Sequence, residues 1–162
     1  MKGITILSRN LIYVVTSVLL VCLSSCNSGS IVQDKFVIPD GQWKIDQTFT
    51  SRVVVTDLQN PYSFFLNVRN GGDYPYSNLH VFVTTTFPNG KKAIDTVNCP
   101  LADKSGRWLG SGLGDLIDNR ILFKFNRKFP LTGKYAFTIE HAMRDTIVPA
   151  IYNVGLSIEK TN

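Results

Sequence analysis

Alternation of apolar and polar residues is the feature of this sequence that most constrains its fold. Short segments place apolar side chains at every second position, and turn residues separate one segment from the next. A period of two puts the apolar side chains on one face of a β-strand, so it predicts antiparallel sheets with one face in a core. The strand-like segments are 52–56, 64–69, 79–86, 121–126, 135–140 and 154–159.

The turns between these segments favour the same fold. Asn89-Gly90 lies between two strand-like segments, and both residues tolerate the positive φ that a tight hairpin requires. No stretch is a convincing amphipathic helix, and the best candidate, 114–119, is long enough for one turn. We therefore expect an all-β fold, an antiparallel, jelly-roll-like β-sandwich of about seven or eight strands. A small barrel is the alternative.

The N-terminus has the layout of a bacterial export signal. Lys2 and Arg9 make the start positive, residues 11–23 are apolar, and small residues lead into Cys26. The apolar run falls short of the ~20 residues that a membrane span needs. The pattern is similar to a lipoprotein signal, in which cleavage before Cys26 leaves a cysteine that carries a diacylglycerol and a further acyl chain such as palmitate. An ordinary signal peptide and an uncleaved anchor are the alternatives.

We divide the chain into a signal peptide (1–25), an acylated cysteine with a flexible tether (26–33) and a β-sandwich domain (34–162). The 137 residues left after cleavage are enough for one domain with a real core. Cys22 leaves with the signal peptide and Cys26 is acylated, so no disulfide forms within the mature chain. We expect Cys99 to be a buried apolar residue at the end of a strand.

Net charge excludes a nucleic-acid partner. Removal of residues 1–25 lowers the formal charge from +5 to +3, and most basic residues are spread along the chain. The densest basic segment, 120–128, holds four basic residues in nine, and we interpret it as a solvated strand edge. Nucleic-acid binding needs a stronger basic stripe than this.

No catalytic, metal-binding or cofactor-binding constellation stands out. The two histidines, His80 and His141, lack a spacing typical of a zinc site, although a site completed by Asp145 stays open as an alternative. Pairs of carboxylates occur in any chain of this length and carry little weight. We therefore expect no catalytic residues, no metal and no cofactor.

The segment 103–115 is the best candidate for contact with a partner protein. Its glycines resemble a phosphate-binding loop, but no long helix follows, so we interpret them as residues of a tight loop with positive φ. Tryptophan and arginine are enriched at binding hot spots, and both lie beside these glycines. The candidate partner-binding residues are Asp103, Arg107, Trp108, Gly110, Gly112, Gly114 and Asp115.

Aromatic residues near the expected loops leave a second function open. Exposed rings could stack on sugars, which would make the domain a carbohydrate-binding module of the cell envelope with a glycan partner. The same rings could instead close the ends of the core. The residues are Trp43, Tyr62, Tyr74, Tyr76, Trp108 and Tyr152.

Five longer runs closely resemble the gliding motility lipoprotein GldH family of the Bacteroidetes. The resemblance covers roughly 34–160 and includes the lipobox that ends at Cys26. It implies a lipoprotein of the gliding motility apparatus, a cell-envelope machine coupled to protein secretion, with other gliding and secretion proteins as partners. It implies no catalytic activity and no functional residue besides Cys26. The runs are 74–79, 82–90, 101–115, 129–131 and 139–145.

The residues after Cys26 predict which way the domain faces. Surface lipoproteins of this bacterial group tend to carry an acidic cluster directly after the cysteine. Residues 27–30, Asn-Ser-Gly-Ser, lack one. We therefore expect an outer-membrane lipoprotein whose domain faces the periplasm.

Overall fold

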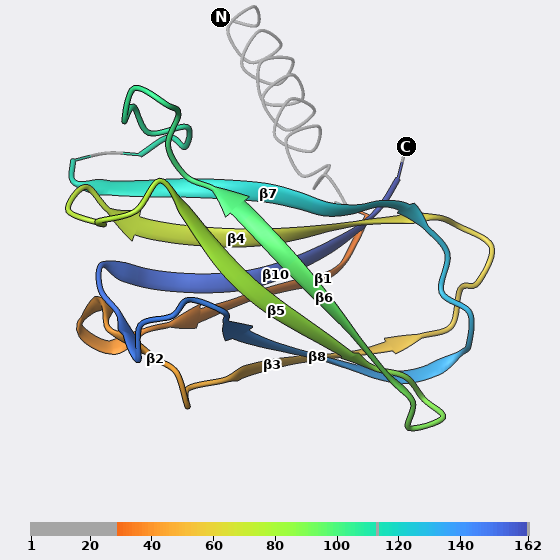
Figure 1. Ribbon diagram of the computed structural model, residues 1–162. Coiled ribbons are helices and arrows are strands. Elements are labelled where there is room, and N and C mark those ends of the chain that lie inside the picture. The colour runs from red at the N-terminus through yellow and green to blue at the C-terminus, as the bar shows by residue number, and fades with distance from the viewer. Residues whose placement is uncertain (1–28, 113, 162) are drawn as a thin grey trace, which may run out of the picture.

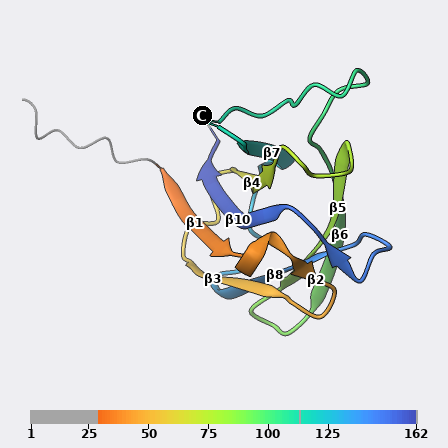
Figure 2. The same cartoon turned by 90° about the vertical axis from the view of Figure 1, so that its left-hand side faces the viewer.

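Two four-stranded antiparallel sheets pack face to face (Figures 1 and 2). The computed structural model describes residues 29–112 and 114–161. The signal peptide and Cys26 lie outside these described residues. Within them, no helix is long and apolar enough to cross a membrane.

The strand order differs from the chain order in both sheets. The first sheet has the order β1 (Ser30–Val37), β10 (Ile151–Lys160), β4 (Tyr62–Gly71) and β7 (Leu116–Arg127). The second has the order β3 (Phe49–Val55), β8 (Gly133–His141), β5 (Asn78–Thr86) and β6 (Lys92–Pro100). A short third sheet pairs β2 (Trp43–Lys44) with β9 (Ile147–Val148). The chain enters β2 from η1 (Pro39–Gly41), the one 3₁₀ turn among the described residues. The all-β sandwich expected from the alternation is confirmed.

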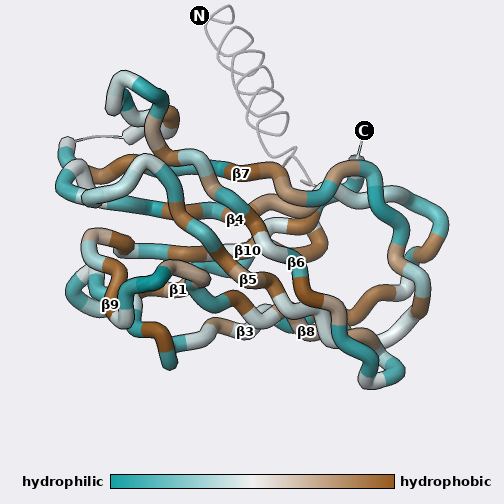
Figure 3. The backbone as a smooth tube through the Cα atoms, viewed as in Figure 1, coloured by the Kyte–Doolittle hydropathy of each residue, from teal (hydrophilic) through white to brown (hydrophobic). Residues whose placement is uncertain are grey.

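The core consists of the inward-facing rows of both sheets. Alternate residues of β5, β8 and the middle of β4 are buried, as the period of two predicts, whereas β10 is buried at every position from Asn153 to Ile158. Figure 3 shows this alternation as brown and teal bands along the central strands. Cys99 is fully buried at the end of β6, where burial raises the pKa of its thiol to about 12. Central core residues include Leu66, Val68, Leu79, Val81, Phe137, Ile139, Leu156 and Ile158.

Strand β7 departs from the expected alternation at its C-terminal half. The sequence pattern placed Phe125 on the same face as Ile121 and Phe123, but Phe125 is 61% exposed. Irregular pairing of β7 with β4 between Leu122 and Arg127 shifts the register. A bulge inserts an extra residue and reverses the faces of those that follow, so strict alternation fails there.

The ends of two elements also differ from expectation. β1 begins at Ser30, so residues 30–33, which we assigned to the tether, pair with β10. Residues 116–119, part of the helical-turn candidate, instead begin β7 and pair with β4. Both differences have one cause, because pairing with a partner strand distant in the sequence overrides weak local preference.

Polar contacts close the sandwich along both of its open sides. On one side, Ser51 of β3 donates a hydrogen bond to Asp34 of β1. On the other, the Lys124 ammonium of β7 lies 2.5 Å from a carboxylate oxygen of Asp95 of β6. These contacts fix the edges of the two sheets relative to each other.

Antiparallel connectivity sorts the loops to two opposite ends of the sandwich. The start of β1, the end of β10 and the connections 56–61, 87–91 and 128–132 lie at one end, which we call the tether end. The connections 38–48, 72–77, 101–115 and 142–150 lie at the other, which we call the far end. Figure 1 shows the tether end on the right and the far end on the left.

Histidine 141 is buried where β8 meets the far end. Its ring packs edge-on against the Trp43 indole at a centroid distance of 5.4 Å, and the side chain is almost fully buried. Neither ring nitrogen has a hydrogen-bond partner among the described residues. Burial lowers the pKa of His141 below its ordinary value of 6.5, and nearby Asp145 and Glu140 oppose this only in part.

We expect His141 to make the fold less stable in mild acid. The unfolded chain binds a proton at this residue more readily than the folded chain, so stability is full above pH 6.5 and declines as the pH falls below it. The slope contributed by one such group is at most about 1.4 kcal/mol per pH unit. Chemical denaturation between pH 7.5 and about 5 measures it.

The variant His141→Leu supplies the control for this measurement. Leucine is of similar size and cannot titrate, so the decline in unfolding free energy between pH 6.5 and 5 should become shallower. An unchanged slope in a folded variant would show that other groups cause the decline.

Candidate functional site

The connection 101–115 begins with a small hairpin that leaves the end of β6. Ala102 and Trp108 form an antiparallel bridge, and the Leu109 N–H donates to the Leu101 carbonyl at 2.8 Å. The tip of this hairpin, residues 103–107, is exposed apart from Asp103. In Figure 1 it stands out from the far end of the sandwich.

Asp103 holds the hairpin tip together. One carboxylate oxygen accepts hydrogen bonds from the Ser105 hydroxyl (2.6 Å), the Ser105 N–H (2.9 Å) and the Arg107 N–H (3.0 Å). The other oxygen accepts from Arg107 Nε at 3.1 Å. The Ser105 hydroxyl and these other donors lower the pKa of Asp103. The carboxylate therefore stabilises the turn itself. The sequence motif alone did not distinguish this structural role from a role in binding a partner.

The two hot-spot candidates differ in exposure. Trp108 is half-buried and packs against the core, so it anchors the hairpin to the sandwich. The Arg107 side chain is 82% exposed, and the neighbouring Leu109 is 55% exposed. Arg107 and Leu109 are therefore more exposed than Trp108, which sequence reasoning had favoured together with Arg107 for contact with a partner.

Two of the loop glycines are required because backbone atoms pass very close to them. A Cβ at Gly110 would meet the Asp118 carbonyl and the Asn119 amide, and a Cβ at Gly112 would overlap the Leu116 carbonyl. This approach lets Ser111 and Asp118 exchange backbone hydrogen bonds at 3.1 and 2.8 Å. Gly110 and Gly112 thus allow the loop to lie directly against β7.

The last two candidates lie apart from the hairpin tip. Gly114 has φ +67°, as expected of this loop, but Gly110 and Gly112 lack the positive φ that was also expected of them. The Asp115 carbonyl accepts a hydrogen bond from the Gly72 N–H at 2.8 Å and so ties the loop to the β4–β5 connection. The candidate residues therefore form an exposed tip around Arg107 and a structural base around the glycines.

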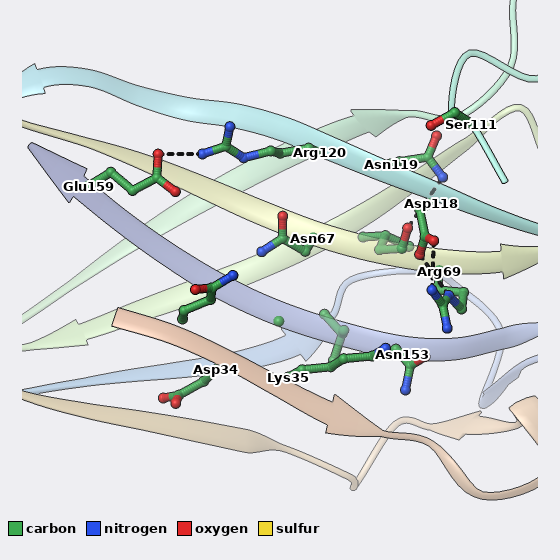
Figure 4. A pocket seen from close by; sticks show the side chains of 14 residues that line it. Asp34, Lys35, Asn67, Arg69, Ser111, Asp118, Asn119, Arg120, Asn153 and Glu159 are labelled. Carbon is green, nitrogen blue, oxygen red and sulfur yellow. Dashed lines mark hydrogen bonds and ion pairs between the residues drawn. The ribbon is translucent and has the colours of Figure 1, made fainter. Parts of the chain in front are cut away.

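A polar hollow lies next to this base, on the outer face of the first sheet. It has a volume of about 570 Å³, and side chains from β1, β10, β4 and β7 line it together with Ser111 (Figure 4). Gly155 lies within it, so no side chain of β10 fills that position. Several of its polar side chains, such as Asn67, Arg69 and Arg120, lie at outward-facing positions of strands whose other face is in the core.

Ion pairs and hydrogen bonds between strands organise the hollow. Arg69 donates two hydrogen bonds to Asp118, at 2.7 and 2.6 Å, and this pairing lowers the pKa of the Asp118 carboxyl. Arg120 pairs with Glu159 at 2.6 Å across the sheet. The Arg120 guanidinium also lies 3.7 Å from the centre of the ring of Phe65. These contacts hold the charged groups in fixed positions before any ligand arrives.

Sequence reasoning missed this hollow although it placed several of its residues correctly. Asn67 and Arg69 occupy the outward phase of the pattern in β4. Their partners on β7 and β10 could not be assigned, because strand order does not follow from periodicity. The sequence did contain one indication of the hollow, because the outward-facing positions of three predicted strand segments are polar.

Half of the six aromatic residues proposed for sugar stacking are buried, and Trp108 and Tyr152 are partly exposed. Trp43, Tyr62 and Tyr74 are buried and close the ends of the core, the second of the two interpretations of these rings. Tyr76 is 37% exposed, and its hydroxyl donates to Asp145. The described residues contain no group of three or more His, Cys, Asp or Glu side chains that could hold a metal ion.

The described chain is therefore an all-β sandwich domain with an ion-paired hollow on one sheet and a hairpin that projects from one end. The GldH lipoprotein family model matches residues 30–158. A gliding motility lipoprotein GldH homolog of Christiangramia forsetii is 34% identical over 150 residues, covering 88% of this chain and 91% of the relative. The gliding motility lipoprotein GldH of Flavobacterium johnsoniae is 28% identical over 147 residues, covering 86% and 91%.

This chain belongs to the GldH lipoprotein family, as the sequence resemblance predicted. Family membership makes it a gliding motility lipoprotein with a lipid-anchored place in the cell envelope. Among solved structures, the carbohydrate-binding module Xyl-CBM35, in complex with a glucuronic acid-containing disaccharide, gives a TM-score of 0.34 at 10% identity. The alignment covers 86% of this chain and 96% of that one.

We expect Asp103→Ala to loosen the hairpin tip without unfolding the sandwich. The Ser105 and Arg107 amides would lose the carboxylate that accepts their hydrogen bonds. Amide hydrogen exchange resolved to residues 103–107 should accelerate there and stay unchanged in the strands. Asp115→Asn is the control, since it also removes one negative charge and the Asp115 side chain makes no hydrogen bond to another described residue. Equal exchange in both variants would contradict the structural role of Asp103.

Proposed function

We propose that this protein is a non-enzymatic structural component of the gliding motility apparatus that binds other envelope proteins associated with secretion. Its anchor is the acylated Cys26, and its contact surface is the far end of the sandwich. The observation that carries the proposal is the exposed hairpin tip, which presents Arg107 and Leu109 on a base fixed to the core by Trp108. A preorganised tip loses little conformational entropy when it binds.

The polar hollow extends this surface. Ser111 belongs both to the loop and to the lining of the hollow, so a partner that grips the hairpin also reaches the outer face of the first sheet. Arg69, Asp118, Arg120 and Glu159 already have partners in the hollow, which favours recognition by shape and hydrogen bonding over a net-charge attraction.

We expect a double variant, Arg107→Ala with Leu109→Ala, to weaken recovery of the partner proteins. Both side chains are mainly exposed, so the fold should stay intact while contacts worth at least ~1–2 kcal/mol are lost. The measurement is an affinity pull-down of the tagged, lipidated protein from gently solubilised host membranes. Trp108→Ala should weaken recovery too, but it also removes core packing and needs a check of folding.

Two controls define the outcome of this pull-down. Arg52→Ala with Val54→Ala makes a matched change on the outer face of β3, where both side chains are exposed. Cys26→Ala removes the acylation site and tests whether recovery depends on the membrane anchor. If the Arg107 and Leu109 variant is folded and recovers the same proteins as wild type, the far end is not the contact surface.

We further propose that the protein is anchored in the outer membrane and that its domain faces the periplasm. Protease added to intact host cells should leave the domain uncut, whereas protease added after permeabilisation of the outer membrane should digest it. The absence of an acidic cluster in residues 27–30 supports this orientation. Removal of the domain from intact cells would overturn it.

A further inference from the structure

Charge is distributed unevenly between the two ends of the sandwich. The tether-end connections and the strand ends that flank them carry six basic residues against two acidic ones, Asp57 and Glu159. The far-end connections, counted with the same flanking strand ends, carry seven acidic residues against four basic ones. The basic residues of the tether end are Lys91, Lys92, Arg127, Lys128, Lys134 and Lys160.

Most of the positive charge at the tether end has no internal partner. Asp57 lies 3.2 Å from the Lys160 ammonium, and Glu159 pairs with Arg120, so both acidic groups are engaged. No acidic group among the described residues lies within 4.0 Å of the other five cations. All five side chains are exposed: Lys91, Lys92, Arg127, Lys128 and Lys134.

An apolar pocket opens among these cations. It has a volume of about 370 Å³ and lies between the end of β7 and the strands of the second sheet. Lys124, Arg127 and Lys128 contribute to its lining beside aromatic rings. The rings are those of Phe64, Phe87, Phe129, Tyr135 and Phe137. A cationic rim around an apolar floor suits a phosphate group attached to an apolar chain.

The length of the tether determines what this end meets. Ser30, where β1 begins, follows Cys26 by only four residues, so the chain between them can span at most ~14 Å. An acyl chain on Cys26 therefore holds the tether end next to the lipid headgroups. This step depends on the acylation of Cys26 that we proposed above.

We propose that the tether end is a second membrane contact, in which its exposed cations bind the phosphate groups of anionic lipids. Basic clusters beside a lipid anchor are attracted to anionic membrane surfaces, and a lipid chain combined with such a cluster anchors more firmly than the chain alone. Docking of this end points the long axis of the sandwich away from the bilayer. The hairpin tip at the far end is then presented to proteins at a distance from the membrane.

The test uses the mature chain, 26–162, with Cys26→Ser so that no lipid is attached. This protein keeps all of the strands and core residues found in the described part of the chain. Co-sedimentation with vesicles of phosphatidylglycerol and phosphatidylcholine should show binding that weakens as salt is raised. Vesicles of phosphatidylcholine alone should bind far less. Because this protein carries no lipid, failure here is separate from failure of Cys26 acylation, which membrane fractionation of Cys26→Ala tests.

A pair of matched variants locates the contact. Arg127→Glu with Lys128→Glu should weaken binding to the anionic vesicles by about tenfold or more. Lys44→Glu with Lys104→Glu makes the same change of charge on exposed far-end residues and should bind like the unsubstituted chain. Equal losses in the two variants, or no binding to anionic vesicles at low salt, would overturn the proposal. In the latter case an acidic partner protein becomes the candidate for this surface.

Discussion

Packing of the two inward faces against each other is the constraint on which the rest of this structure depends. Leu66 and Leu156 of the first sheet and Phe137 and Ile139 of the second are almost completely buried. Each such side chain contributes roughly 1.5–3 kcal/mol through the removal of apolar surface from water. Without this burial the sheets would not associate, and neither the outer hollow nor the end loops would have fixed positions.

The antiparallel order of the strands then divides the molecule into two ends with different chemistry. The connections at one end include the basic segments and lie at the same end as the start of β1. The long 101–115 connection lies at the other end. A lipid attached at Cys26 would place the first end at a bilayer and the second away from it. In this arrangement the sandwich would separate the proposed anchor from the proposed contact surface.

Within the 101–115 connection, much of the conspicuous sequence maintains the loop. Asp103 satisfies the amides of the hairpin tip, and Gly110 and Gly112 let the chain pass close to β7. Their neighbours Arg107 and Leu109 are left exposed as a result. Distinctive residues in a loop can therefore be conformational requirements, with the contact made by less distinctive residues that they hold in place.

The sequence by itself determined the fold class, the faces of most strands and the family, because alternation and turn residues act locally. It failed at Phe125, where a bulge reverses the faces, and at Ser30, where pairing with β10 extends the domain. Only the tertiary structure decided the strand order. That order brings four strands together around the polar hollow and places basic residues from separate connections at one end. Local sequence patterns could not predict it, because they carry no information on contacts between distant segments.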